Sequence, residues 1–129
     1  MSSDDVNFFF TMRDQIKLYH WQTHSFAQHK ATDELLDSLD KAIDEYVEVY
    51  MGRYSRPKMA TRNSTIRIQN MNQKTILKFL KECVSYLEGP LVQQLKPTDT
   101  ELVNLRDEML ADINKVMYLF TLQWAESHS

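Results

Sequence analysis

Apolar residues recur every three or four positions in four stretches of the chain, and this spacing predicts four amphipathic helices. We expect these helices from Asp4 or Asp5 to about Gln22, from about Ser25 to Tyr50, from about Asn70 to Glu88, and from Thr98 to about Trp124. Two of the three connections are short, which favours antiparallel neighbours. The pattern therefore predicts an all-α protein in which residues 1–129 form a single four-helix-bundle domain.

Helix-start signals accompany two of these stretches. Ser25 and Gln28 have the spacing of a capping box at the start of the second helix, and Thr98 and Glu101 have the same spacing at the start of the fourth. We expect each pair to satisfy free N–H groups of the first helical turn.

The apolar stripes predict which side chains form the core. Trp21 is expected to lie in the core as well, and Cys83 is interpreted as a small core residue because no activating base is placed beside it. The predicted core comprises Phe9, Met12, Ile16, Tyr19, Leu36, Leu39, Ile43, Val47, Tyr50, Ile76, Leu80, Cys83, Val84, Leu87, Leu102, Leu105, Met109, Ile113, Val116, Phe120 and Trp124.

Composition narrows the class of protein. The chain has 129 residues, a single cysteine and a formal net charge of −3, which argue against an intrachain disulfide and against a general affinity for nucleic acid. No apolar run reaches the roughly 20 residues of a membrane span, and the first residues lack the basic start of a signal peptide. We expect a cytoplasmic protein.

Basic residues gather in the connection at residues 52–67, which contains Arg53, Arg56, Lys58, Arg62 and Arg67 and no acidic residue. The segment could contact phosphates or an acidic partner. The alternative, to which we give about twice the weight, is a solvated connection whose positive charge offsets the charge of nearby acidic residues.

The second helix carries a row of possible metal ligands on one side. The row is His29, Asp33, Asp37, Asp40, Asp44 and Glu48. Steps of three and four residues stack these side chains on one stripe of a helix. A rise of about 1.5 Å per residue separates Asp33 from Asp44 by roughly 16 Å, so one chain cannot close both ends of the row around one ion.

A second copy of the helix resolves this difficulty. The row is symmetric about a point between Ser38 and Leu39, and an isologous two-fold contact has the same symmetry. Antiparallel pairing there would create two equivalent sites, each built from both chains. The facing pairs would be His29 with Glu48, Asp33 with Asp44, and Asp37 with Asp40.

The alternative interpretation of the row is a solvated acidic helix face without chemistry. Two observations weigh against it. Aspartate is a poor residue in the middle of a helix, yet it is used four times. The short connection after the first helix also allows His20 and His29 to converge, with Asp33 one turn further along. A di-iron site in the bundle centre is not expected, because the chain lacks the required Glu-x-x-His steps.

These residues resemble those of the Dps-like miniferritins of the ferritin-like superfamily. The resemblance rests on His20-Trp21, Phe26, His29, Asp33, Glu34, Asp44-Glu45 and Glu48. It implies a ferritin-like bundle that assembles at least as a two-fold homodimer, with a larger shell as the alternative. It also implies a ferroxidase centre in which His20, His29 and Asp33 of one chain and Asp44 and Glu48 of the other hold iron, as one ion or two. The acidic N-terminus differs from the lysine-rich tail of DNA-binding members.

The sequence thus leads to one main hypothesis and two others. The main hypothesis is a protein that binds Fe(II) at the interface between two copies and oxidises it with peroxide or dioxygen. The second is a non-catalytic ferritin-like bundle that serves as a structural or protein-interaction module. The third, nucleic-acid binding through residues 52–67, is not favoured.

Overall fold

The computed structural model describes residues 1–122 and contains four α-helices and one short 3-10 helix in that range. Its elements are α1 (Ser3–Gln22), α2 (Phe26–Arg53), η1 (Thr61–Asn63), α3 (Gln73–Glu88) and α4 (Thr100–Phe120). The described part of the chain contains no strand. The predicted all-α four-helix bundle is therefore confirmed, whereas Trp124 lies outside the described residues.

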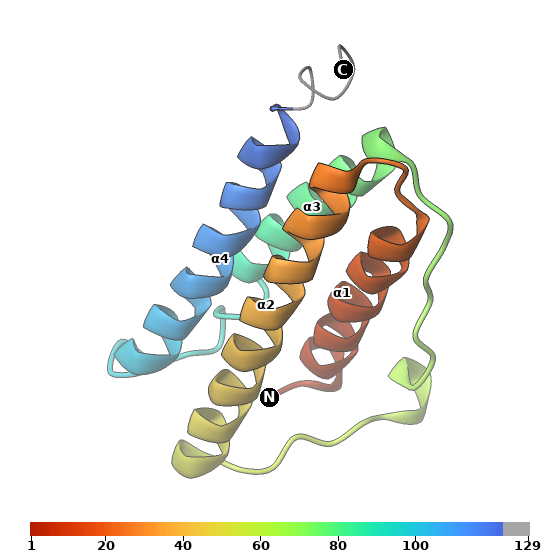
Figure 1. Ribbon diagram of the computed structural model, residues 1–129. Coiled ribbons are helices and arrows are strands. Elements are labelled where there is room, and N and C mark those ends of the chain that lie inside the picture. The colour runs from red at the N-terminus through yellow and green to blue at the C-terminus, as the bar shows by residue number, and fades with distance from the viewer. Residues whose placement is uncertain (123–129) are drawn as a thin grey trace.

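One long connection sets the order of the bundle (Figure 1). The chain between α2 and α3 returns along the whole length of the bundle, so that α2 and α3 run in the same direction and α1 and α4 run opposite to them. As a result, α2 packs most extensively against α4, which lies far from it in the sequence, and next against α1. Bundles with one long crossover connection are an established variant of four-helix architecture.

The core follows the predicted apolar stripes. Every predicted core residue within residues 1–122 is buried, except Val47, Tyr50 and Val84, which are partly buried against the core. Trp21 is a correction, because 67% of its surface is exposed. It occupies the last turn of α1 on the outer stripe with Lys17, whose ammonium group lies 5.4 Å from the centre of its ring.

Side chains at the helix starts agree with one expectation and contradict another. Ser25 accepts a hydrogen bond of 3.1 Å from the Gln28 N–H, as expected of an N-cap. The predicted capping box of Thr98 and Glu101 is wrong, because α4 begins one residue later with Asp99 at the N-cap position. The Asp99 side chain makes no cap hydrogen bond and instead binds groups outside the helix.

Amide side chains of α1 hold the long connection in place. Gln15, which is 1% exposed, pairs with the backbone of Gln69 through hydrogen bonds of 2.8 and 3.0 Å. Asn7 donates to the Asn63 carbonyl, and Gln22 bonds to Asn70. We refer to residues 54–72 as the strap. Helix α1 binds the strap mainly through the strap's backbone. The side chains of the basic residues in the strap remain exposed.

Asp99 joins the end of α2 to the start of α4. Its carboxylate is 0% exposed and accepts hydrogen bonds from the Tyr54 hydroxyl (2.5 Å) and the Lys96 N–H (2.8 Å). Arg53 Nε lies 2.7 Å from Oδ1, but outside the directions that a hydrogen bond requires, so this contact is ionic. The Tyr54 hydroxyl and then the Lys96 N–H lower the pKa of Asp99.

Acid should therefore weaken the bundle at this junction. Because the pKa of Asp99 is lower in the folded state, its contribution to the free energy of unfolding is present above the unfolded pKa of about 4 and disappears as the pH falls through the folded value. We expect Asp99→Asn to melt at a lower temperature at pH 7 and to lose less stability between pH 5 and 2. Thermal melts across that range test this, with Asp107→Asn as a control at an exposed ion pair. Parallel curves for Asp99→Asn and wild type would contradict it.

No helix in the described part of the chain is both long and apolar enough to cross a membrane.

Candidate metal-ligand pair and acidic helix face

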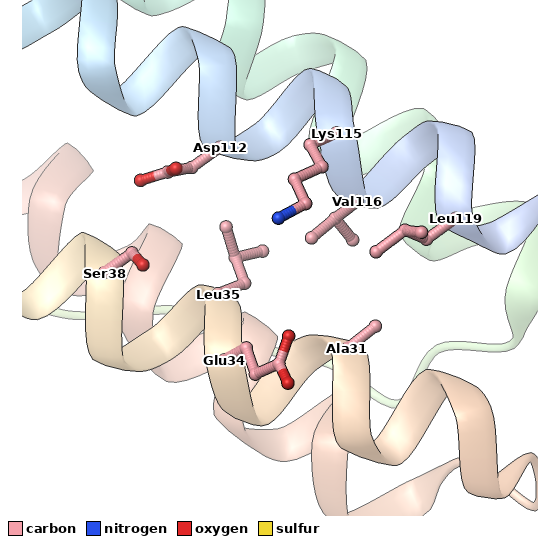
Figure 2. Close-up of a pocket in the computed structure, with 8 residues that line it drawn as sticks. All are labelled: Ala31, Glu34, Leu35, Ser38, Asp112, Lys115, Val116 and Leu119. Carbon is pink, nitrogen blue, oxygen red and sulfur yellow. The ribbon is translucent and has the colours of Figure 1, made fainter.

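The cavity between α2 and α4 is too small to hold a substrate (Figure 2). Its volume is about 40 Å³, room for little more than one water molecule. Figure 2 shows Glu34 and Ser38 projecting from α2, and Asp112 and Lys115 projecting from α4. Burial raises the pKa of Asp112. Glu34 and Lys115 are exposed at its rim, whereas Leu35 and Val116 beside them are buried where α2 packs against α4.

His20 and His29 lie against each other where α1 meets α2. Their imidazole rings are stacked, with centroids 3.9 Å apart and planes inclined by 16°. His20 is 6% exposed, whereas His29 is exposed. The three-residue connection between the helices makes this contact possible, because it turns the chain back at once. The predicted convergence of the two histidines is confirmed.

The hydrogen bonds of the two rings are reciprocal. His20 Nδ1 lies 2.7 Å from the His29 carbonyl oxygen, and His29 Nδ1 lies 2.8 Å from the His20 carbonyl oxygen. A carbonyl oxygen only accepts hydrogen bonds, so each Nδ1 must carry the proton. In the neutral rings, each Nε2 then keeps a free lone pair. The structure gives neither Nε2 a hydrogen-bond partner within residues 1–122.

Thr32 supports the same assignment. Its hydroxyl oxygen lies 3.0 Å from His20 Nδ1 and 2.8 Å from the Gln28 carbonyl oxygen. Because the hydroxyl donates its proton to a carbonyl, its lone pairs face His20 and accept from Nδ1–H. Groups that fix a ring in this way are typical around histidines that bind metal through the other nitrogen. This role of Thr32 was not predictable from its sequence pattern.

The acidic residues of the row lie along the exposed side of α2. Asp33, Asp37, Asp44 and Glu48 are exposed and have no ion pair with any residue in the described part of the chain. Asp40 differs, because Arg13 on α1 lies 2.7 Å from its carboxylate. Arg13 was not predicted, because nothing in its local sequence pattern sets it apart from the other polar residues of α1.

A single chain brings together only part of the predicted ligand set. The structure joins His20 to His29, with Asp33 one turn along the same helix, while Asp44 and Glu48 lie further along. Across residues 1–122, no group of three or more His, Cys, Asp or Glu side chains in one chain could hold a metal ion. Of the five candidate ligands, the two that contact each other within residues 1–122 are His20 and His29.

The fold and these side chains define a four-helix-bundle protein with a histidine pair beside an exposed acidic helix face. Residues 20–120 match a protein family described as a family of unknown function, DUF5856. The chain belongs to this family, and the matched range includes all five candidate ligands. No curated protein and no solved structure matches the chain.

Proposed function

We propose that this protein is a miniferritin-like protein that binds Fe(II) between two copies of the chain and oxidises it. The observation that carries the proposal is the reciprocal hydrogen bonding of His20 and His29. It leaves two adjacent imidazoles with the Nε2 lone pairs that a borderline metal ion prefers.

The arrangement of the helices is compatible with this proposal. A bundle with one long crossover connection is the architecture of ferritin-like proteins, and the strap supplies such a connection here. This topology is shared by proteins of other functions, so it supports the fold relationship only.

A two-fold partner would supply the ligands that one chain lacks. In the proposed dimer, the two histidines and Asp33 of one copy face Asp44 and Glu48 of the other. The three carboxylates offset the charge of the iron as it rises from Fe(II) to Fe(III). At the centre of the contact, Asp37 faces Asp40, and Arg13 already partly neutralises Asp40 within each chain.

The proposed reaction transfers one electron from each Fe(II) to an oxidant, either dioxygen or peroxide. With peroxide, two Fe(II) ions supply the two electrons that cleave the O–O bond, and two protons complete the formation of two water molecules. The protein's part is to hold the iron in a mixed nitrogen and oxygen environment and to stabilise the product ion.

Anaerobic Fe(II) titration followed by exposure to oxidant tests the proposal. We expect wild type to bind Fe(II) with at least tenfold higher affinity than His29→Ala or Asp44→Ala, since each variant removes a ligand from every site. Glu45→Ala is the matched control, because Glu45 is exposed beside Asp44 but outside the row. Equal affinity and oxidation rate in all four proteins would refute the proposal.

A non-catalytic assembly module is the second candidate function. The ion pair between Arg13 and Asp40 favours it, because it shows that one acid of the row has a structural partner. In that case the titration would find no iron bound specifically by wild type.

A further inference from the structure

The most exposed large hydrophobic side chains in the described part of the chain lie at one end of the bundle. They are Phe26 (76% exposed), Trp21 (67%), Tyr118 (61%) and Leu122 (48%). Trp21 lies in the last turn of α1, Phe26 begins α2, Tyr118 lies in the last turn of α4, and Leu122 follows that helix. Figure 1 shows these helix termini at the same end of the molecule, together with the start of α3.

Contacts between the helices fix the arrangement of this end. The Tyr19 hydroxyl, near the end of α1, donates a hydrogen bond to the Gln28 side chain in the first turn of α2. The centre of the Tyr19 ring lies 6.2 Å from that of Phe120, the last residue of α4. The Gln22 side chain donates a hydrogen bond of 2.7 Å to that of Asn70, just before α3. All four helices are therefore joined where the exposed apolar side chains lie.

The same end carries a local positive charge. We define the basic end as residues 17–31, 69–78 and 115–122, which lie within about two helical turns of these termini. These ranges contain no acidic residue, although the chain as a whole has a formal net charge of −3. Their lysine side chains are exposed and have no ion pair with any other residue in the described part of the chain. They are Lys17, Lys30, Lys74, Lys78 and Lys115.

Trp21 and Lys17 form an amphipathic pair on this surface. The Lys17 ammonium group lies 5.4 Å from the centre of the Trp21 ring. Tryptophan and lysine are both favoured at the boundary between lipid headgroups and acyl chains. There the ring enters the apolar layer while the long lysine side chain keeps its ammonium group among the headgroups.

The shape and composition of the basic end favour a lipid surface over single-stranded nucleic acid. Sites for single strands place aromatic rings along a basic groove, so that successive bases stack on them. Trp21 and Phe26 instead flank a three-residue turn at the tip of a helical hairpin, and Leu122 has no ring on which a base could stack. Exposed apolar side chains surrounded by lysines match a membrane with anionic headgroups in both polarity and charge.

We propose that the basic end docks this protein on an anionic lipid membrane. Trp21 and Phe26 insert among the headgroups, and the lysines bind the phosphates and carboxylates of the lipids. This contact is different from a membrane span, because only side chains at the helix ends enter the lipid. The proposal goes beyond the iron chemistry and depends on neither iron nor the two-fold pairing.

Vesicle co-sedimentation tests the proposal. We expect wild type to sediment with vesicles of about one-third phosphatidylserine and two-thirds phosphatidylcholine, and not with phosphatidylcholine alone. Trp21→Ala should weaken binding about tenfold, because it removes an aromatic side chain that the lipid buries. Phe10→Ala is the matched control and should bind like wild type, because Phe10 is 43% exposed on α1 but outside the basic end. Absence of wild-type binding, or an equal loss in both variants, would overturn the proposal.

A pair of double variants separates the basic end from the overall charge. Lys17→Gln combined with Lys30→Gln should weaken binding roughly tenfold or more, since each lysine near an anionic surface contributes to the affinity. Arg56→Gln combined with Lys58→Gln changes the net charge equally at exposed positions of the strap. It should bind like wild type. Equal weakening by the two double variants would show that net charge governs the binding, and it would overturn the proposed surface.

Tryptophan fluorescence tests the insertion itself. The chain has two tryptophans, so Trp124→Phe leaves Trp21 as the only one. We expect a phosphatidylcholine with a nitroxide at the top of its acyl chain to quench Trp21 in vesicle-bound protein. Unquenched fluorescence in bound protein would overturn the proposal. Binding of a single-stranded oligonucleotide in place of vesicles would also overturn it and would assign the basic end to nucleic acid.

Discussion

Two variants that each bind no iron should regain roughly a quarter of the wild-type iron capacity when they are refolded together. The first variant combines His29→Ala with Asp33→Ala, and the second combines Asp44→Ala with Glu48→Ala. In a homodimer of either variant, every proposed site has two of its ligands replaced by alanine. The mixed dimer has one site with no ligand changed and one site in which both halves are changed.

The expected fraction follows from random pairing. Half of the dimers are mixed, and one of their two sites is intact, which gives about one quarter of the wild-type sites. All four substituted residues are exposed, so both variants should fold. Fe(II) binding is measured before and after joint refolding. No recovery, despite mixed dimers seen by mass spectrometry, would show that the site is not shared.

Leu39→Ala should cause the largest loss of stability, about 2–5 kcal/mol in the free energy of unfolding. Leu39 is 0% exposed in the middle of α2, whose packing against α4 and α1 is the most extensive in the bundle. Removing its three terminal carbon atoms leaves a cavity that the surrounding helices cannot fill. Urea denaturation monitored by circular dichroism measures the change.

Asp37→Ala is the control for this prediction, because it removes an exposed side chain two residues away on the same helix. It should change the free energy of unfolding by no more than about 0.5 kcal/mol. A similarly small change for Leu39→Ala would mean that α2 packs less tightly against α4 and α1 than the structure indicates.

Local signals in the sequence were sufficient to locate the helices and most of the core. The spacing of Leu102, Leu105 and Met109 defines the buried side of α4, and all three are buried. The approach of His20 to His29 was also predictable, because a connection of three residues leaves the two helices no other arrangement. These features depend on residues that lie close together in the chain.

Features that depend on distant residues were not predictable. The exposure of Trp21 reflects where the other helices lie, which its hydrophobic character does not reveal. Asp99 was expected to belong to a simple capping box, but Arg53 and Tyr54, at the far end of α2, bind its carboxylate. The hydrogen bonding of Gln15 to the backbone of the strap was not predictable from the sequence. Their partners are 45 or more positions away in the sequence.

The shared ligand set remains a prediction from the sequence. The structure brings His20 and His29 together, and it leaves Asp33, Asp44 and Glu48 exposed along α2. Two histidines in defined tautomers support the proposal of a metal site more strongly than the acidic row alone. Acidic residues at helical spacing also occur on ordinary solvated helices.

The long return of the strap has a consequence for the order in which the chain folds. Helices α2 and α4, the most extensively packed pair, are separated by residues 54–99. Contacts that close so large a loop form slowly. The chain loses conformational entropy when the loop closes, and the contacts that compensate for this loss form only afterwards. During synthesis, the α1–α2 hairpin therefore emerges first and keeps one apolar side uncovered until α4 has left the ribosome.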